Sequence, residues 1–331
     1  MTLELYPTLA CNLDCAFCDT TDRHRQPVNE LPTERLLEIV DEAAALGAQR
    51  LFLLGGGEPL VRKRATPLIM ERAKAHGMEG ILTTNGTLLN DGLISRIIDM
   101  GWDEIHFSID GPTSAIHDPL RGQSGAFKRT VRNACKLNVI KRRLGLRHPR
   151  IAIHFVLTQA NHHTLTEMVD LAHAIGAFRV DFDALIAYTP DQLRLQLTAE
   201  QRAQVARDAA AALERAQQLG IETTLENFLD PDRLERGQRV PARPDGDGLK
   251  GAPCLKAWHY LVVQADGLSS PCCVLAGQGG SVADQSVSDV WHRDPFMEQV
   301  RTGMLAGQPL ERCAECSWNI LSHEAEIRRH L

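Results

Sequence analysis

The chain has 331 residues, 44% of them hydrophobic, and a formal net charge of −6 at pH 7. This length is enough for one large α/β domain and a small second domain. The acidic balance gives no indication of nucleic-acid binding, and no run approaches the roughly 18 apolar residues that span a membrane. Residues 1–6 lack the features of a signal peptide. The nine cysteines therefore indicate reduced thiols or metal ligands in a cytoplasmic protein.

Short apolar strands alternate with amphipathic helices over the first two-thirds of the chain. Strands are predicted at residues 3–6, 50–54, 80–84, 104–109, 151–157 and 179–186. Apolar residues at helical spacing end at Gly47, and Thr198 with Gln201 forms a capping box for a helix that ends at Gly220. This alternation predicts parallel strands joined by right-handed crossovers. Six such units are too few for an eight-stranded barrel and fit an open, partial (β/α)6 barrel.

The composition changes after the helix that ends at Gly220. Proline, glycine and charged residues become frequent, which predicts a linker, and a cysteine-rich segment follows. We therefore predict a barrel domain at 1–224, a linker at 225–250 and a small second domain at 251–331.

Cys11, Cys15 and Cys18 follow the first predicted strand with the spacing C-x₃-C-x₂-C. Three thiolates are one short of the four that complete a [4Fe–4S] cluster, so one iron would stay open. The spacing resembles that of the radical S-adenosylmethionine (SAM) enzymes. The resemblance implies that the open iron binds SAM, and that reduction gives a 5′-deoxyadenosyl radical that abstracts hydrogen. Surface thiols or a zinc site with a distant fourth ligand are the alternatives.

Further motifs of this family follow the other predicted strands. Gly55-Gly56-Gly57-Glu58-Pro59 matches the G-G-E-P motif, in which glycines admit a close ligand and the carboxylate holds the SAM amino group. The resemblance also assigns Ser108 to the SAM carboxylate or ribose, Asn85 and Asp110 to shaping the pocket, and Arg121 to the SAM carboxylate. All lie at or beyond carboxyl ends of strands, where barrel enzymes build their sites. Ordinary turn residues and a surface arginine are the alternatives.

Cys254, Cys272, Cys313 and Cys316 form a second set that could close a [4Fe–4S] cluster without an open iron. A strand and an Asp266-Gly267 turn would fold Cys272 back beside Cys254. The element from Gly267 to Cys272 resembles the SPASM extension of radical SAM enzymes. No cysteine follows Cys316, which favours the shortened "twitch" version with one auxiliary cluster. A structural zinc ribbon is the alternative.

Candidate general bases lie on the last two predicted strands of the barrel. His154, Asp181 and Asp183 are expected to face inward, although each could equally be an ordinary barrel residue. The basic stretch at 141–148 could dock an acidic electron donor of the flavodoxin or ferredoxin type, or simply complement a helix C-terminus.

The cofactors expected from the resemblance are SAM and two [4Fe–4S] clusters. The cysteine motif begins at residue 11, so we expect no appended peptide-recognition domain, and hydrogen abstraction from a small hydroxylated or amino substrate. Net oxidation would follow, with the auxiliary cluster as electron acceptor. The alternative is a peptide substrate that is crosslinked or epimerised. A non-catalytic iron–sulfur electron carrier is a third possibility, but it would not need the SAM-binding motifs.

Overall fold

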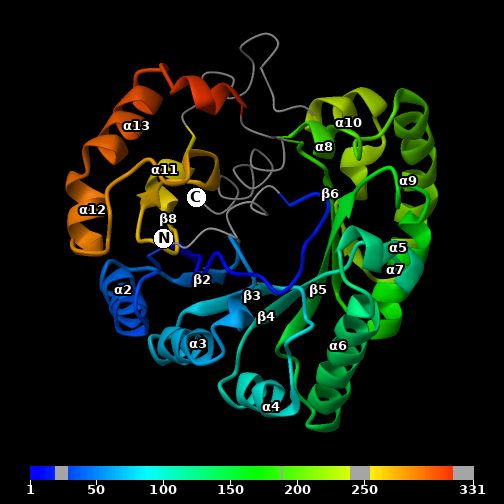
Figure 1. The fold of residues 1–331 in the computed structure, drawn as a ribbon, viewed down its shortest axis with the longest axis horizontal. Helices are drawn as coiled ribbons and strands as arrows, with labels where there is room; N and C mark the ends of the chain where they lie inside the picture. The colour runs from blue at the N-terminus through cyan, green and yellow to red at the C-terminus, as the bar shows by residue number, and fades with distance from the viewer. Residues whose placement is uncertain (19–28, 188, 239–253, 316–331) are drawn as a thin grey trace. The chain divides into compact units, whose positions relative to one another are not determined.

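The computed structural model describes residues 1–18, 29–187, 189–238 and 254–315, and the chain divides into two compact units (Figure 1). The terminal unit comprises Met1–Ala10, Arg23–Ile81 and Pro241–Leu331. The central unit comprises Cys11–Asp22 and Leu82–Val240. None of the helices in the described ranges has the length and apolar content needed to cross a lipid bilayer.

The terminal unit is built on the strands β1 (Thr2–Leu5), β2 (Arg50–Leu53), β8 (Tyr260–Val263) and β9 (Ser269–Ser270). β1 pairs in parallel with both β2 and β8, and β9 returns antiparallel to β8. The α-helices of this unit are α2 (Thr33–Ala45), α3 (Ala65–Ala75), α11 (Lys256–His259), α12 (Val287–Arg293) and α13 (Pro295–Leu305). The apolar face predicted for α2 is buried through Leu36, Ile39, Val40 and Ala43.

The central unit contains the parallel strands β4 (Glu104–Ser108), β5 (Arg150–Leu157), β6 (Arg179–Ala184) and β7 (Glu222–Thr223) in that order. Its helices include α4 (Asp91–Asp99), α5 (Ser114–Leu120), α6 (Ala126–Arg143), α7 (Leu165–Ile175) and α9 (Ala199–Leu219), with the short α8 (Pro190–Leu193) before α9. Strand β3 (Glu79–Thr84) crosses the boundary between the units. All six predicted strands are present, with ends shifted by at most two residues.

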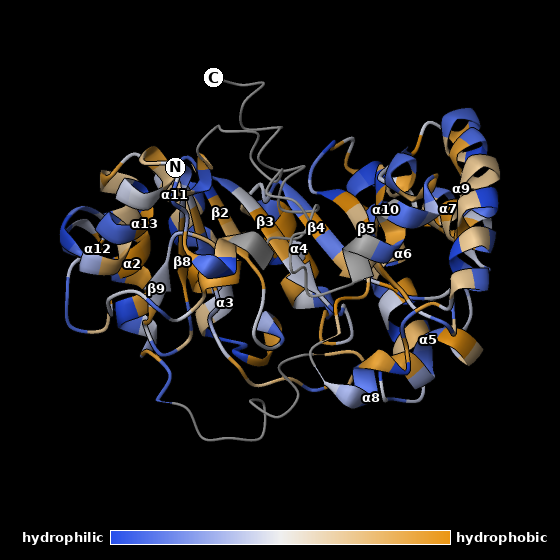
Figure 2. Ribbon diagram, turned by 90° about the horizontal axis from the view of Figure 1, so that it is seen from above, coloured by the Kyte–Doolittle hydropathy of each residue, from blue (hydrophilic) through white to orange (hydrophobic). Residues whose placement is uncertain are grey.

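Helix α9 shows how local sequence signals determine where a helix begins and ends. The predicted capping box is present at its start, where Thr198 and Gln201 bond to each other's backbone, and Gly220 ends it in a left-handed conformation. Its buried residues recur at helical spacing, and Figure 2 shows hydrophilic and hydrophobic residues alternating along it. Such a helix is stabilised mainly by packing its apolar face, here on α7.

The stretch predicted as a linker is folded in its first half. The 3₁₀-helix η2 (Leu225–Phe228) and helix α10 (Pro231–Gln238) contact α9, with Phe228 and Leu234 buried. Pro231 is the first residue of α10, where the missing N–H of proline costs no helix hydrogen bond. The proline that indicated a linker therefore begins a helix, whereas residues 239–253 lie outside the described ranges.

Alternation along β5 and β6 creates one apolar and one polar face. Ile153, Phe155 and Phe182 are fully buried on one face, where the Phe155 and Phe182 rings contact each other. Residues on the other face of β6 are less buried and all charged: Arg179, Asp181 and Asp183. Because side chains alternate along a strand, His154 of β5 lies on this polar face, next to Asp181 in the register.

Candidate active site

The first cysteine loop belongs to the central unit, where hydrogen bonds attach it to two elements. The Ala16 N–H donates to the Leu120 carbonyl at the end of α5 (2.9 Å), and the Asn12 side chain donates to Thr87 Oγ1 beyond β3 (2.9 Å). A Cβ on Gly122 would lie 2.1 Å from the Asp14 carbonyl oxygen, so only glycine fits there. These contacts hold the loop at the carboxyl ends of the strands.

A buried ion pair lies directly beneath this loop. The guanidinium of Arg121 pairs with the carboxylate of Asp110, which is fully buried. Arg121 Nη1 also donates to Cys15 Sγ (3.7 Å), and its guanidinium lies 5.2 Å from the Phe17 ring centroid. The other oxygen of Asp110 accepts the Val156 N–H near the end of β5 (2.9 Å). This chain of contacts connects the cysteine loop to the strands that carry the candidate bases.

The chemistry of these cysteines fits a bound cluster. Burial raises the pKa of Cys15 to about 11, and the charge of Arg121 opposes this shift. Thiolates are the form that ligates iron, and a neighbouring cation or metal ion favours them. Three part-buried thiols within eight residues, with Arg121 against one of them, suit a cluster that carries negative sulfurs.

Asn85 and Ser108 also lie at this edge of the central unit. Asn85 donates to Asn12 in the cysteine loop (3.0 Å) and accepts from the backbone and side chain of Thr87 (3.0 and 2.6 Å). It therefore acts as a turn residue and also contacts the cysteine loop. Ser108 ends β4 opposite His154. The roles assigned to Asn85, Ser108, Asp110 and Arg121 in SAM binding stay predictions.

The glycine-rich turn belongs to the terminal unit and packs against the residues that precede Cys11. The Gly57 N–H donates to the Thr8 carbonyl (3.0 Å) and the Glu58 N–H to the Ala10 carbonyl (2.9 Å). A Cβ on Gly57 would lie 2.1 Å from the Ala10 oxygen. Glu58 is buried, and its carboxylate accepts the Leu60 N–H (3.1 Å) to cap a short 3₁₀-helix, η1 (Pro59–Val61). Its contact with the SAM amino group stays a prediction.

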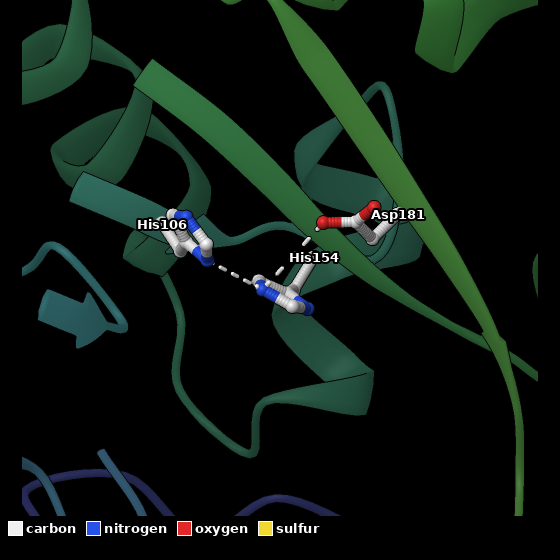
Figure 3. A group of neighbouring side chains, drawn as sticks. All are labelled: His106, His154 and Asp181. Atoms are coloured by element: carbon white, nitrogen blue, oxygen red, sulfur yellow. Dashed lines mark hydrogen bonds and ion pairs between the residues drawn. The ribbon is translucent and has the colours of Figure 1, made fainter. Parts of the chain in front are cut away.

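A polar cluster occupies the inner face of β4, β5 and β6 (Figure 3). His106 Nδ1 lies 2.8 Å from His154 Nε2, and His106 Nε2 lies 2.9 Å from a carboxylate oxygen of Glu104. His154 in turn lies 3.8 Å from Asp181 and 3.7 Å from Asp183. The structure therefore brings all three predicted bases together.

Sequence reasoning missed His106 and Glu104. Both share the face of β4 that carries Ser108, so strand alternation was the signal that could have found them. Burial lowers the pKa of His106 to about 4, which outweighs its hydrogen bond to Glu104. Burial would also lower the pKa of His154, but the attraction of Asp183 and Asp181 outweighs it and raises that pKa.

Two arginines balance the carboxylates of this cluster. Arg150 pairs with Glu104, and Arg179 Nε lies 3.0 Å from Asp181. Ligand atoms of His106, His154 and Asp181 lie within 4.8 Å of one another, a spacing that a divalent metal ion could also use. The side chains of this cluster thus offer either proton transfer or metal binding.

Three of the four C-terminal cysteines converge in the terminal unit. Cys254, Cys272 and Cys313 belong to one apolar cluster with Leu275 and Val300, and Cys316 lies outside the described residues. The predicted hairpin is confirmed, because β9 pairs with β8 across a turn in which Gly267 has φ +89°. The arrangement fits a shared cluster of thiolates.

The basic stretch at 141–148 ends α6 and leads into β5. Its arginines are exposed, together with Leu144 and Leu146. The stretch lies at the amino-terminal end of β5, whereas the cysteine loop connects to the carboxyl-terminal end through Asp110 and Val156. An electron donor docked there would face the end of β5 opposite to the one that the cysteine loop contacts.

Sequence profiles of two families match the chain. The radical SAM superfamily profile covers residues 5–172, and a SPASM iron–sulfur cluster-binding domain covers 254–317. The chain belongs to the radical SAM superfamily. As in other members of its SPASM/twitch subgroup, its cofactors are SAM and two [4Fe–4S] clusters.

Similar proteins span most of this radical SAM protein. An AdoMet-dependent heme synthase of Methanosarcina barkeri is 23% identical over 298 residues, covering 89% of this chain and 82% of the relative. A PqqA peptide cyclase of Granulibacter bethesdensis is 26% identical over 319 residues, covering 94% of this chain and 79% of the relative.

Solved structures show the same fold. SuiB of Streptococcus suis bound to S-adenosylmethionine has a TM-score of 0.69 at 18% identity, covering 91% of this chain and 67% of SuiB. The structure of anSMEcpe with bound AdoMet has a TM-score of 0.66 at 16% identity, covering 97% of this chain and 87% of anSMEcpe. The predicted fold class, a partial radical SAM barrel with a small C-terminal SPASM-like domain, is confirmed.

Proposed function

We propose that this protein oxidises a small hydroxylated or amino substrate by two electrons, with its auxiliary cluster as the electron acceptor. The bound and reduced SAM cluster supplies a 5′-deoxyadenosyl radical, which removes one hydrogen atom from a C–H bond. The substrate then loses one proton to a protein base and one electron to the auxiliary iron–sulfur cluster. An H–C–X–H group thereby becomes C=X, where X is oxygen or nitrogen.

The observation that supports this proposal is the connection between the cysteine loop and the candidate bases His154, Asp181 and Asp183, which we call the base cluster. Cys15 contacts Arg121, which pairs with Asp110, and Asp110 accepts the Val156 N–H. Val156 is the register partner of Asp183. Neighbouring strands lie about 4.8 Å apart. Asp183 of the base cluster therefore lies only one strand away from Val156, the residue of β5 that Asp110 contacts.

A base at this position suits an oxidation. A carbon radical beside a hydroxyl or amino group becomes a stronger reductant when that group loses its proton. His154, Asp181 and Asp183 offer this function on an inner strand face. Asp183 is the most exposed of the three, with 37% of its side chain accessible.

A peptide substrate is the second candidate. Its support is the relation to a PqqA peptide cyclase, 26% identical over 94% of this chain. A modified peptide need not undergo net oxidation to a C=X group, so the products distinguish the two. A non-catalytic electron carrier has less support, because the glycine-rich turn and the cysteine loop of a SAM-cleaving enzyme are both present.

The test uses the anaerobic, cluster-loaded protein with SAM and a reductant. Deuterated polyols, aminocyclitols, nucleosides and peptides are screened for deuterium transfer into 5′-deoxyadenosine. We expect transfer from a small substrate, one 5′-deoxyadenosine per product, and a product two hydrogens poorer. A variant in which Cys11, Cys15 and Cys18 are alanine should form no 5′-deoxyadenosine. Transfer from peptides alone, or catalytic recycling of SAM, would overturn the proposal.

A further inference from the structure

We propose that His154 accepts the substrate proton at Nδ1, and that Glu104 and His106 are positioning residues that hold its imidazole in the required tautomer. The inference rests on the proposed function, because it names the atom that serves as base. It follows from an inventory of donors and acceptors along the row Glu104, His106, His154 and Asp183.

The row begins at a carboxylate that can only accept hydrogen bonds. Glu104 is buried, which would raise its pKa, yet the hydrogen bond that it accepts from His106 and the charge of Arg150 outweigh burial and lower that pKa. An ionised carboxylate is acceptor only. The hydrogen between Glu104 and His106 Nε2, which lie 2.9 Å apart, therefore belongs to the histidine.

The tautomer of His106 then fixes that of His154. Because burial lowers its pKa to about 4, His106 is neutral near pH 7 and carries one ring hydrogen. That hydrogen is on Nε2, so Nδ1 is an acceptor. Its neighbour at 2.8 Å is His154 Nε2, which must donate. When His154 is neutral, its lone pair is therefore on Nδ1.

The groups around His154 suit a base at Nδ1. This nitrogen lies 3.7 Å from Asp183, longer than a direct hydrogen bond. Asp181 lies 3.8 Å from the other nitrogen and is held by Arg179 at 3.0 Å. The charged groups of β4 and β6 that face His154 thus include two carboxylates that stabilise the imidazolium once it has formed.

An isosteric change at Glu104 tests the tautomer. In Glu104→Gln the side-chain amide can donate to His106 Nε2, so the ring hydrogen of His106 can move to its Nδ1. His106 Nδ1 then donates to His154 Nε2, and the hydrogen of neutral His154 moves to its own Nδ1. We expect product per 5′-deoxyadenosine to fall by about 100-fold, the scale of general base catalysis. Deuterium transfer should persist. His106→Gln should retain most product, because its amide can both accept from His154 and donate to Glu104.

Two controls separate this effect from structural damage. Arg150→Gln removes the ion pair of Glu104 but keeps its carboxylate, and should lower product per 5′-deoxyadenosine much less than Glu104→Gln does. His173→Gln changes an exposed histidine of α7 away from the cluster, and should have no effect. Equal losses in Arg150→Gln and Glu104→Gln would assign the effect to the ion pair and overturn the proposal.

The tautomer has a readout that does not depend on turnover. In ¹⁵N-histidine NMR of the oxidised, cluster-loaded protein, neutral His154 should show a protonated Nε2 and an unprotonated Nδ1, with the signals assigned by His154→Gln. Glu104→Gln should exchange the two. A protonated Nδ1 on neutral His154 of the wild-type protein, or tight binding of added Mn²⁺ by His106 and His154, would overturn the inference. Failure of net oxidation with the expected tautomer would instead contradict only the proposed function.

The pH dependence has a defined sign. The raised pKa of His154 means that its proton-accepting form appears as the pH rises through that pKa, so product per 5′-deoxyadenosine should rise with pH. Asp183→Asn removes a charge that raises the pKa, and should shift the profile to lower pH. A profile that does not move would contradict a base at His154.

Discussion

Arg121 shows how one residue supports two parts of the site. Its guanidinium neutralises the carboxylate of Asp110, which has no solvent exposure, and donates to Cys15 in the first cysteine loop. An unpaired buried charge is costly, and removal of one partner of a buried pair commonly costs about 3–5 kcal/mol. The stability of the cysteine loop should therefore depend on this arginine whether or not it also contacts SAM.

We predict that Arg121→Met lowers the free energy of unfolding by about 3–5 kcal/mol, because it leaves the Asp110 carboxylate buried without a counter-ion. Anaerobic urea titration of the cluster-loaded protein measures this. The double variant Asp110→Asn with Arg121→Met should be more stable than the single variant, since it removes both charges. A single variant as stable as wild type would show that Asp110 does not need this partner.

At the scale of single residues, the sequence predicted the positions of those candidate site residues that belong to a motif or to an alternating strand pattern. The alternation along β5 and β6 was sufficient to place His154 and Asp183 on one polar strand face, and the cysteine spacing was sufficient to single out the loop of Cys15. The roles of these residues in the reaction stay predictions. His106 and Glu104 were not predicted, because an isolated histidine and glutamate on a strand are no different from ordinary barrel residues. Strand alternation places both on the face of β4 that carries Ser108, but the contact of His106 with His154 on the neighbouring strand becomes visible only in the structure.

At the scale of elements, the glycine-rich turn is shaped by the segment before Cys11. Gly57 has the closest approach, since its Cβ position lies 2.1 Å from the Ala10 carbonyl oxygen. The same backbone donates from Glu58 to that oxygen. Any side chain at Gly57 must separate the turn from the residue preceding the cysteine loop.

We predict that Gly57→Ala weakens SAM binding at least about tenfold, because the added methyl group displaces the turn, whereas iron content stays near that of the wild type. Equilibrium dialysis with labelled SAM measures the affinity. Gly92→Ala in α4 is the matched control, since the nearest atom to its Cβ position is 3.6 Å away. That helical change should leave SAM binding unaltered and add roughly 0.5–1 kcal/mol of stability. Normal SAM affinity in Gly57→Ala would show that the turn does not depend on this contact.

The sequence predicted the elements with strong local patterns and missed those that depend on distant pairing. Strands β1 to β6 and the capping box of α9 follow from periodicity and caps. The parallel pairing of β8 with β1 joins residues more than 250 positions apart, so no local pattern indicates it. Helix α10 was missed because a proline at a helix start resembles a proline in a linker.

At the scale of the whole molecule, the residues that we expect to hold the cofactors are divided between the two units. The first cysteine loop and the base cluster belong to the central unit, and the described C-terminal cysteines belong to the terminal unit. The terminal unit draws on both ends of the chain, because β8 pairs with β1. Changes to the C-terminal cysteines should therefore act on a different step from changes to Cys11, Cys15 and Cys18.

We predict that alanine at both Cys254 and Cys272 halves the iron content, from about eight to about four atoms per chain, because one four-iron cluster is lost. Deuterium transfer into 5′-deoxyadenosine should survive at a reduced level, while product per 5′-deoxyadenosine falls, since the substrate radical lacks its electron acceptor. Iron analysis and mass spectrometry of both products measure these effects. Cys273→Ala, at an exposed neighbouring cysteine, should keep all the iron and the full yield. Full product formation without the auxiliary cluster would show that it is structural and that the second electron leaves by another route.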